Sequence, residues 1–317
     1  MSEEIEPSEI IKEAIDEGYT DFYVAYSGGK DSGIALDFIT KEFPENFRGI
    51  IFVDTGIATK ATVDFVKDYC KKHDYKLNIL HPYDVKRKKK SDYGEIGQPF
   101  TFENLVMNFG FPTAGGHNLT MGWLKYYPMR NFIYQKIKDG ENPAIISGVR
   151  KKESKRRSKR KSYAGYINHD GKITFVCPLF YKSNEWVTKY WIENDIKRSP
   201  VYDTLHISGD CLCGCFAKKE ELKLLEMFHP EVFAEIKRLE KLVKEKGTKE
   251  AQRYTTWGNN KQSTVEVEAQ STIEDAVCTE CFFDRDAKEE DTKRFNDEMS
   301  EIDRKIDKLI KTGKYEK

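Results

Sequence analysis

The chain has 317 residues, enough for one large α/β domain or two smaller ones. Lysine plus arginine and aspartate plus glutamate each number 53, so the zero net charge gives no global indication of a nucleic-acid or membrane partner. No apolar run reaches membrane-spanning length, and the acidic, helix-patterned N-terminus does not resemble a secretory signal. We therefore expect a cytoplasmic protein with reduced thiols and no membrane partner.

Hydrophobic periodicity predicts alternating helices and strands in the first part of the chain. Helices are expected over residues 8–18, 33–43 and 62–72, and strands over residues 22–26, 48–56 and 76–82. This alternation predicts an α/β fold with a doubly wound parallel sheet. Ligands of such sheets bind beyond the carboxyl ends of the strands.

The later segments are expected to cover and extend this sheet. Residues 83–122 show no clear period, so we expect loops and short helices there. Further patterns predict strands within 142–150 and 173–180, helices over 184–195 and 221–245, a linker over 255–275, and an amphipathic helix from residue 291. We expect an α/β domain over residues 1–205 and a helical, cysteine-containing C-terminal region over residues 206–317.

The stretch SGGKDS, residues 27–32, follows the first predicted strand. Gly28 and Gly29 allow a tight turn that brings backbone N–H groups close to an anion. The following helix N-terminus adds its positive dipole end. Lys30 adds a mobile cation, and Ser27 and Ser32 add hydroxyls that can donate hydrogen bonds. Asp31 adds a carboxylate that could hold Mg²⁺ through water. The stretch lacks the GxxxxGK[ST] spacing of a Walker A loop. The alternative to a phosphate-binding loop is a glycine-rich turn whose charges are solvated.

SGGKDS resembles the pyrophosphate loop of the N-type ATP pyrophosphatases, which cleave ATP between its α and β phosphates. This adenine nucleotide alpha hydrolase-like group includes ATP sulfurylase small subunits, tRNA-thiolating enzymes and, in a divergent branch, the PAPS (phosphoadenylyl-sulfate) reductases. The resemblance implies a nucleotide-binding α/β domain whose loop residues 27–32 bind an adenine nucleotide, with Lys30 and Asp31 in catalytic roles.

Two stretches resemble the PAPS reductase group more closely. The turn DTG resembles that group's turn against the nucleotide, which implies contacts from Asp54, Thr55 and Gly56; the alternative is a helix N-cap turn. GWLKYYP, residues 122–128, resembles the segment CCxxxKxxP and keeps its lysine, Lys125, for which the resemblance implies a catalytic role.

Two further stretches follow in the family's order. ISGVRKKESKRR resembles the motif G-x-R-x-x-(E/D)-S-x-x-R, and its matching residues are Gly148, Arg150, Ser154 and Arg157. The resemblance implies that these bind the nucleotide and that Arg150 is catalytic, since a guanidinium can grip phosphate or sulfate through two hydrogen bonds. Residues 178–203 resemble the PL…P-(L/V)-Y stretch, so the resemblance covers residues 20–216.

The chain also departs from the family pattern. PAPS reductases usually carry an eroded phosphate loop, whereas the loop here is intact, which favours ATP over PAPS or APS. The nucleophilic tail motif E-C-G-[LI]-H is absent. Thr120 and Met121 stand where iron–sulfur reductases have paired cysteines. These departures argue against ordinary sulfonucleotide reduction.

Five clustered cysteines suggest a metal centre, namely Cys211, Cys213, Cys215, Cys278 and Cys281. Thiolates from two parts of a chain suit a tetrahedral Zn²⁺ or a [4Fe–4S] cluster, each of which needs four ligands. The resemblance favours iron–sulfur, because a PAPS reductase-like enzyme of DNA phosphorothioation is associated with such a cluster. The alternatives are free thiols, as expected for Cys70 and Cys177, and redox dithiol chemistry.

Two basic runs stand out in this neutral chain, KRKKK at 86–90 and RKKESKRRSKRK at 150–161. Most such runs are solvated surface. The alternative is that they guide a nucleic-acid backbone towards the site.

The leading hypothesis is an ATP pyrophosphatase-type enzyme linked to sulfur chemistry. Its partners would be an adenine nucleotide with Mg²⁺, a nucleic-acid or small-molecule acceptor, and a sulfur donor or a thioredoxin-like reductant. One alternative is a PAPS or APS reductase of unusual type. Another is a non-catalytic subunit that binds nucleotide or nucleic acid.

Overall fold

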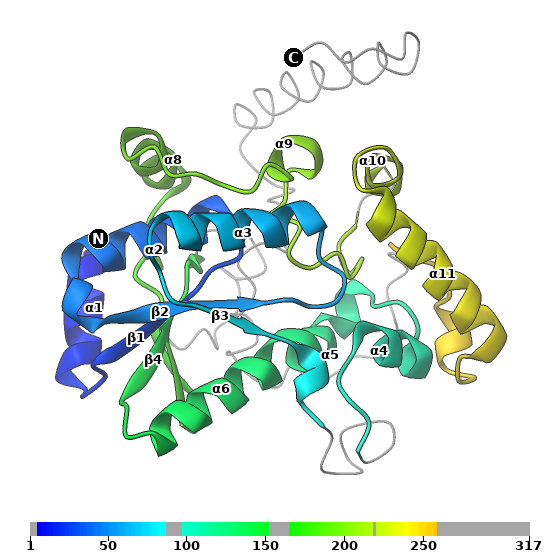
Figure 1. Ribbon diagram of the computed structural model, residues 1–317, viewed down its shortest axis with the longest axis horizontal. Coiled ribbons are helices and arrows are strands. Elements are labelled where there is room, and N and C mark those ends of the chain that lie inside the picture. Colours follow the sequence, from blue (N-terminus) through cyan, green and yellow to red (C-terminus); the bar gives the residue numbers. More distant parts are fainter. Residues whose placement is uncertain (1–4, 87–96, 152–164, 171, 218–219, 259–317) are drawn as a thin grey trace, which may run out of the picture.

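A computed structural model describes residues 5–86, 97–151, 165–170, 172–217 and 220–258 (Figure 1). Six strands form one sheet in the order β3-β2-β1-β4-β6-β5. Their bounds are Asp21–Ala25 (β1), Phe47–Val53 (β2), Leu77–Leu80 (β3), Pro143–Ile146 (β4), Ile167–Asp170 (β5) and Ile173–Val176 (β6). All neighbouring strands pair in parallel except β5, which pairs antiparallel with β6.

Helices cover both faces of the sheet, which confirms the predicted doubly wound α/β fold (Figure 1). The α-helices are α1 (Pro7–Asp16), α2 (Lys30–Glu42), α3 (Lys60–Lys72), α4 (Phe102–Phe109), α5 (His117–Met121), α6 (Tyr127–Lys138), α8 (Asn184–Glu193), α9 (Tyr202–Leu205), α10 (Glu221–Phe228) and α11 (Pro230–Lys246). Short turns of other helix types are η1 (Pro44–Asn46), η2 (Pro82–Asp84), η4 (Ala114–Gly116), η5 (Gly122–Tyr126) and η7 (Ala251–Arg253).

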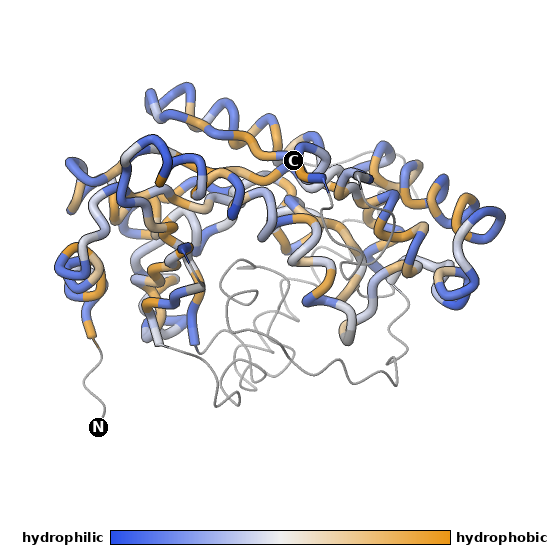
Figure 2. The backbone as a smooth tube through the Cα atoms, turned by 90° about the horizontal axis from the view of Figure 1, so that it is seen from below, coloured by the Kyte–Doolittle hydropathy of each residue, from blue (hydrophilic) through white to orange (hydrophobic). Residues whose placement is uncertain are grey.

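Alternating side chains of the central strands build a separate core on each face of the sheet. In β1, Phe22 and Val24 pack with α1, α2, α3 and α8, while Tyr23 packs with η5 and α6. This two-sided burial explains why the strands read as near-continuous apolar runs. Figure 2 shows hydrophilic and hydrophobic residues alternating along the helices, as expected for helices that bury one side.

The strand order places a topological switch point beside β1. The chain moves from β1 to β2 and β3 on one side, and then crosses to β4 on the other side of β1. The loops after β1 and β4 therefore leave the same edge of the sheet side by side. Crevices of this kind bind the ligands of open α/β folds.

A third core lies beyond the sheet. It joins α4 and η5 to α10, α11 and the segment that carries the clustered cysteines. Side chains from both predicted domains contribute to it, for example Leu105 and Trp123 from the first and Leu225 and Val243 from the second. The boundary near residue 205 stays a prediction.

Several predicted boundaries need correction. Helix α2 begins at Lys30 rather than Gly33, so half of the glycine-rich loop forms the first turn of the helix. The helical region 221–245 is two helices that break at Pro230, because proline cannot donate the backbone hydrogen bond that would continue the first helix. Strand β5 and helix α6 were not predicted. The predicted helix from residue 291 and the linker beyond residue 258 lie outside the described residues.

Within the ranges described, the helices are all too short or too polar to cross a membrane.

The side chain of Trp257 ties the end of the described chain to the third core. Its indole N–H donates to the carbonyl of Leu212 (2.8 Å), and its backbone N–H donates to Glu240 Oε1 (3.0 Å). We expect Trp257→Ala to lower the free energy of unfolding by about 3–5 kcal/mol. Trp257→Phe keeps an aromatic ring and should cost about 1–2 kcal/mol, measured by urea denaturation.

A control for this prediction is Ile192→Ala, because the side chain of Ile192 is 65% exposed. It should change the free energy of unfolding by less than about 0.5 kcal/mol. A Trp257→Ala protein as stable as this control would contradict the assigned packing.

Candidate functional site

The glycine-rich loop connects β1 to α2 at the switch point. Gly28 has a φ of +84°, a conformation that favours glycine. Gly29 is the N-cap of α2 and, having no side chain, makes no capping hydrogen bond. The first N–H to bond within the helix is that of Gly33, to the carbonyl of Gly29 (2.9 Å). The N–H groups of residues 30–32 therefore lie ahead of the helical hydrogen-bond ladder.

Three other helices of the protein begin differently, whereas α10 and α11, like α2, have no side-chain cap. Helices α3, α4 and α8 are capped by Thr59, Thr101 and Ser183, whose side chains each accept a hydrogen bond from a first-turn N–H. Such caps satisfy donors that a helix leaves unpaired. Helix α2 lacks such a cap, so its N-terminus retains donors and the positive end of the helix dipole for an anion.

The two serines of the loop brace it from inside. Their hydroxyl oxygens, on Ser27 and Ser32, lie 3.0 Å apart. Ser32 Oγ donates to the carbonyl of Gly29 (3.1 Å), and the N–H of Gly29 donates to Ser27 Oγ (3.3 Å). The turn is thus held in shape without a ligand.

Asp31 is the buried charge of the loop. Lys30 Nζ lies 2.8 Å from its Oδ1, and Arg150 donates to its Oδ2 through Nε (3.1 Å) and Nη2 (3.0 Å). Burial alone would raise the pKa of Asp31, but the charges and hydrogen bonds of Lys30 and Arg150 outweigh it and hold the pKa below its ordinary value. Asp31 is therefore a carboxylate with a cation on each oxygen.

Arg150 fixes the turn after β4 against this loop. Only 3% of the residue is exposed, and its Nη1 donates to Asn184 Oδ1 (2.7 Å). The structure thus uses Arg150 to position Asp31, and the direct grip on phosphate stays a prediction. Gly148 lies in the same turn, where a Cβ would come within 2.6 Å of the Asp31 backbone. Glycine at this position lets the two loops touch.

The DTG turn after β2 forms a second part of this edge. The N–H of Gly56 donates to Asp54 Oδ1 (3.1 Å), which confirms a turn. Thr55 is buried and donates to the backbone carbonyl of Asp210 (3.0 Å), so its hydroxyl is already used. Asp54 is partly exposed, and its Oδ2 lies 3.8 Å from His81 Nδ1. Of the three predicted nucleotide contacts, Asp54 and Gly56 have accessible surface.

Lys125 forms a buried ion pair that was not predicted. Its ammonium binds Asp210, which also accepts a hydrogen bond from Ser208 Oγ (2.7 Å). Lys125 lies in η5, a π-helical interruption between α5 and α6, and such interruptions are frequent at functional sites. The pair joins the sheet-covering helices to the cysteine segment.

Three of the predicted metal ligands lie directly after Asp210. The sulfurs of Cys213 and Cys215 are 3.5 Å apart, and Cys215 Sγ lies 3.8 Å from Thr120 Oγ1. Within the described ranges, no three Cys, His, Asp or Glu side chains are arranged to hold a metal ion. Cys278 and Cys281 lie outside those ranges, as do Ser154 and Arg157, so the full ligand set stays a prediction.

The pKa values of Cys211 and Cys213 are both raised, which favours the protonated thiol at neutral pH. The hydrogen bond with Cys213, together with burial, raises the pKa of Cys211 well above its usual value. The hydrogen bond with Cys211 lowers the pKa of Cys213, but its bond to Cys215 and burial raise it overall. Binding of a metal here would therefore release protons.

Residues that were not predicted join the glycine-rich loop to the segment that precedes the cysteines. The N–H of Ser199 donates to the carbonyl of Gly28 (2.7 Å), and its hydroxyl lies 2.8 Å from that of Thr62. Thr62 in turn donates to the carbonyl of Ser208. In the sequence, the available signals were Ser199, which precedes a proline, and Asp210, which precedes the cysteine run. They indicate a turn or a polar site but not a partner.

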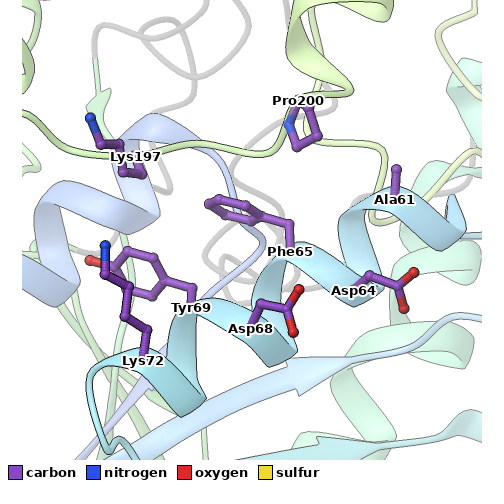
Figure 3. Close-up of a pocket in the computed structure, with 8 residues that line it drawn as sticks. All are labelled: Ala61, Asp64, Phe65, Asp68, Tyr69, Lys72, Lys197 and Pro200. Atoms are coloured by element: carbon purple, nitrogen blue, oxygen red, sulfur yellow. The ribbon is translucent and has the colours of Figure 1, made fainter.

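A groove of about 480 Å³ lies on the outer side of α3 (Figure 3). It is lined by Ala61, Asp64, Phe65, Asp68, Tyr69, Lys72, Lys197 and Pro200. None of the predicted site residues lines it. Because it carries charges of both signs and none of the loop N–H groups, we do not place the nucleotide there.

A family model described as the phosphoadenosine phosphosulfate reductase domain matches residues 21–221, more than half of the chain. The chain belongs to this family. The family resemblance inferred from residues 20–216 is thereby confirmed, and the matched range holds the loop, the DTG turn, Lys125, Arg150 and the three cysteines of the GDCLCGC stretch.

Individual relatives of this PAPS reductase-family chain are distant. An uncharacterised protein of Methanocaldococcus jannaschii is 28% identical over 214 residues, which are 66% of this chain and 45% of that protein. The chain thus spans less than half the length of this relative. A Candida auris PAPS reductase in its phosphate complex is 20% identical, with a TM-score of 0.41 over 63% of this chain and 85% of that one. An NH₃-dependent NAD synthetase of Campylobacter jejuni is 13% identical, with a TM-score of 0.38 over 77% and 91%.

The ion pairs of Asp31 predict a pH-dependent stability. Because the folded-state pKa of Asp31 is lowered, its contribution is fully present above the unfolded value of 3.8 and is lost as the pH falls through the folded value. Asp31→Asn leaves buried Arg150 uncompensated and should cost about 3–5 kcal/mol at pH 7. The difference between wild type and variant should shrink below about pH 4, as urea midpoints would show.

The control for this series is Asp195→Asn, which removes an exposed carboxylate that pairs with Lys197. It should cost less than about 1 kcal/mol at any pH. A cost for Asp31→Asn that is equally small at pH 7 would rule out the assigned role of the pair.

Proposed function

We propose that this PAPS reductase-family protein binds ATP at the switch point, with the triphosphate on residues 27–32. The observation that carries the proposal is the start of α2, which has a left-handed glycine, no side-chain cap, and first-turn N–H groups ahead of the helical ladder. These donors and Lys30 match the charge and oxygen atoms of phosphates. An intact loop supports ATP rather than a sulfonucleotide that lacks β and γ phosphates.

The proposed reaction is adenylyl transfer. An acceptor oxygen forms a bond to the α-phosphorus while the bond from that phosphorus to the α–β bridging oxygen breaks. Pyrophosphate leaves with the electron pair, and the acceptor proton passes to solvent. Lys30 and the loop N–H groups would stabilise the charge that develops on the leaving group. A sulfur nucleophile would then displace AMP from the activated acceptor.

Three of the predicted cations have a defined part in this proposal. Lys30 has a partly exposed side chain, so its ammonium can exchange Asp31 for phosphate. Arg150 would act as a positioning residue that keeps Asp31 and the loop in place. Lys125 would hold Asp210 and the cysteine segment against the DTG turn. Mg²⁺ would arrive with ATP. When Lys30 turns to phosphate it frees Asp31 Oδ1, and Asp31 would then hold Mg²⁺ through water.

We also propose a metal centre at the cysteines, either [4Fe–4S] or Zn²⁺. Cys213 and Cys215 approach each other, and Cys215 lies against Thr120, the position where the resemblance places a cysteine of iron–sulfur reductases. The chemistry of these thiols suits both metals, and Cys278 and Cys281 would complete the ligand set. An iron–sulfur cluster would supply electrons or carry sulfur, while Zn²⁺ would act as a structural clamp.

The nucleotide proposal is tested by calorimetric titration of ATP and Mg²⁺ into variants of the loop. Lys30→Ala removes the mobile cation and should weaken binding at least tenfold, about 1.4 kcal/mol. Gly148→Ala should weaken it by displacing the loop, since a Cβ there would meet the Asp31 backbone at 2.6 Å. The matched control is Gly116→Ala, where a Cβ meets nothing within 4 Å.

Wild-type affinity in both Lys30→Ala and Gly28→Ala would refute the assignment of the loop. Release of pyrophosphate from ATP, once an acceptor is supplied, would establish the reaction class.

The metal proposal is tested by metal analysis of anaerobically purified protein. We expect about four irons per chain and a brown colour for a cluster, or about one zinc and no colour for a clamp. Cys213→Ser and Cys215→Ser should each lower the metal content strongly, whereas Cys70→Ala, at a buried thiol in the core of the sheet, should not. Metal-free wild-type protein that is fully folded would contradict the proposal.

A second candidate function is reduction of PAPS or APS. It is favoured by the family match and by the 3.5 Å approach of Cys213 and Cys215. In that reaction two thiols would become a disulfide while the sulfonucleotide is cleaved to sulfite and the nucleoside phosphate, and thioredoxin would restore the thiols. Sulfite release from PAPS or APS with reduced thioredoxin would distinguish this function from adenylyl transfer.

A further inference from the structure

The exposed aromatic side chains of the described protein gather near one helix. Among all the described residues, four large hydrophobic side chains are substantially exposed, namely Tyr83, Tyr134, Ile192 and Met227. The two aromatic ones both belong to this region: Tyr134 lies on α6, and Tyr83 lies in η2, which packs against α6 and η5. Tyr83 is 53% exposed. Tyrosine is enriched at binding interfaces because its ring is apolar and its hydroxyl end is polar.

An arginine with no acidic partner lies among these rings. The guanidinium carbon of Arg130 is 4.7 Å from the ring centre of Tyr127 and 6.0 Å from that of Tyr134. Among the described residues, no carboxylate lies within ion-pair distance of Arg130, and its Nε is buried without a hydrogen-bond partner. Arg48, Arg150, Arg198 and Arg238 each pair with a carboxylate, whereas Arg253, like Arg130, has no such pair among the described residues. Among the described residues, no carboxylate therefore neutralises the charge of Arg130, which favours an anionic ligand at this guanidinium.

The aromatic surface reaches the candidate nucleotide site. The rings of Tyr83 and His81 stack with centres 4.6 Å apart and an interplanar angle of 14°. His81 in turn lies 3.8 Å from Asp54 of the DTG turn. A ligand that stacks on Tyr83 would thus extend towards the edge of the sheet where the phosphates are proposed to bind.

A basic run begins three residues after Tyr83. Lys86 is exposed, and its backbone forms an antiparallel β-bridge with Pro99. Phe100, the residue after Pro99, has its ring centre 5.1 Å from that of Tyr127. Lys86 is also the first residue of KRKKK in the sequence. Positive charge therefore begins beside the aromatic rings, in a chain whose net charge is zero.

We propose that Tyr83, Tyr134, Arg130 and Lys86 form a platform that binds single-stranded nucleic acid. Bases would stack on the tyrosines and on the Arg130 guanidinium, and phosphates would meet the charges of Arg130 and Lys86. Unpaired bases are required because stacking needs an open π face. The further statement that this strand is the acceptor of the adenylyl group rests on the proposed function, whereas the binding itself does not.

The test measures binding of fluorescent single-stranded RNA and DNA of about 15 nucleotides to the full chain by anisotropy, without ATP. We expect binding that weakens steeply with salt. Tyr83→Ala and Tyr134→Ala should each weaken it about five- to a hundredfold, whereas Tyr83→Phe should keep it, because stacking does not need the hydroxyl. Arg130→Gln should weaken binding and reduce its salt dependence.

Two matched controls come from elsewhere on the surface. Ile192→Ala removes an exposed apolar side chain, and Arg198→Gln removes an arginine that lies 4.8 Å and 4.2 Å from the rings of Trp191 and Tyr202 but is paired with Asp203. Both should bind as wild type does. Circular dichroism and thermal unfolding would confirm that each variant is folded.

The proposal is overturned if wild type binds neither strand at low salt, if the platform variants bind like Ile192→Ala, or if duplexes bind as tightly as single strands. Preference for RNA or for DNA identifies the natural ligand, and either supports the platform. Titration of ATP in parallel separates the two proposals. Intact ATP binding without strand binding refutes the platform alone, whereas strand binding without ATP binding refutes the proposed function alone.

Discussion

The buried ion pair between Asp31 and Arg150 is the contact on which the geometry of the site depends. A buried carboxylate is costly unless cations compensate it, and here Arg150 and Lys30 approach its two oxygens separately. Asp31 belongs to the first turn of α2, and Arg150 follows β4. Their contact therefore locks together the two loops on either side of the switch point. Gly148 allows this contact because it has no side chain to hold the loops apart.

A second set of contacts places the cysteine segment at the same edge. Ser199 bonds to the backbone of Gly28, and Asp210 binds Lys125 and accepts a hydrogen bond from Thr55. The chain then continues at once into the three thiols. Any chemistry of these sulfurs would thus take place close to the DTG turn and within the same rigid framework as the loop. This proximity is the observation that supports the proposal of nucleotide and sulfur chemistry in one protein.

The sequence predicted features whose causes are local and missed those that depend on distant partners. The first strands and the loop were predictable because apolar runs and paired glycines act locally. Helix α6 was missed because YPMRNFIYQKIK mixes aromatic and charged residues without a clear apolar stripe, and β5 because INHD is half polar. The bond between Asp31 and Arg150 joins residues 119 positions apart, and no local pattern specifies it. The resemblance identified Arg150 as important, but only the fold shows which atom it binds.

The central claim is that phosphates bind the N–H groups at the start of α2. Hydrogen exchange measured residue by residue, with and without ATP and Mg²⁺, tests it most directly because it reports on those groups themselves. The account predicts that nucleotide slows exchange at the amides of residues 28–32, which precede or begin the helical ladder. Unchanged exchange at these amides under saturating nucleotide, or protection confined to the groove on α3, would contradict it.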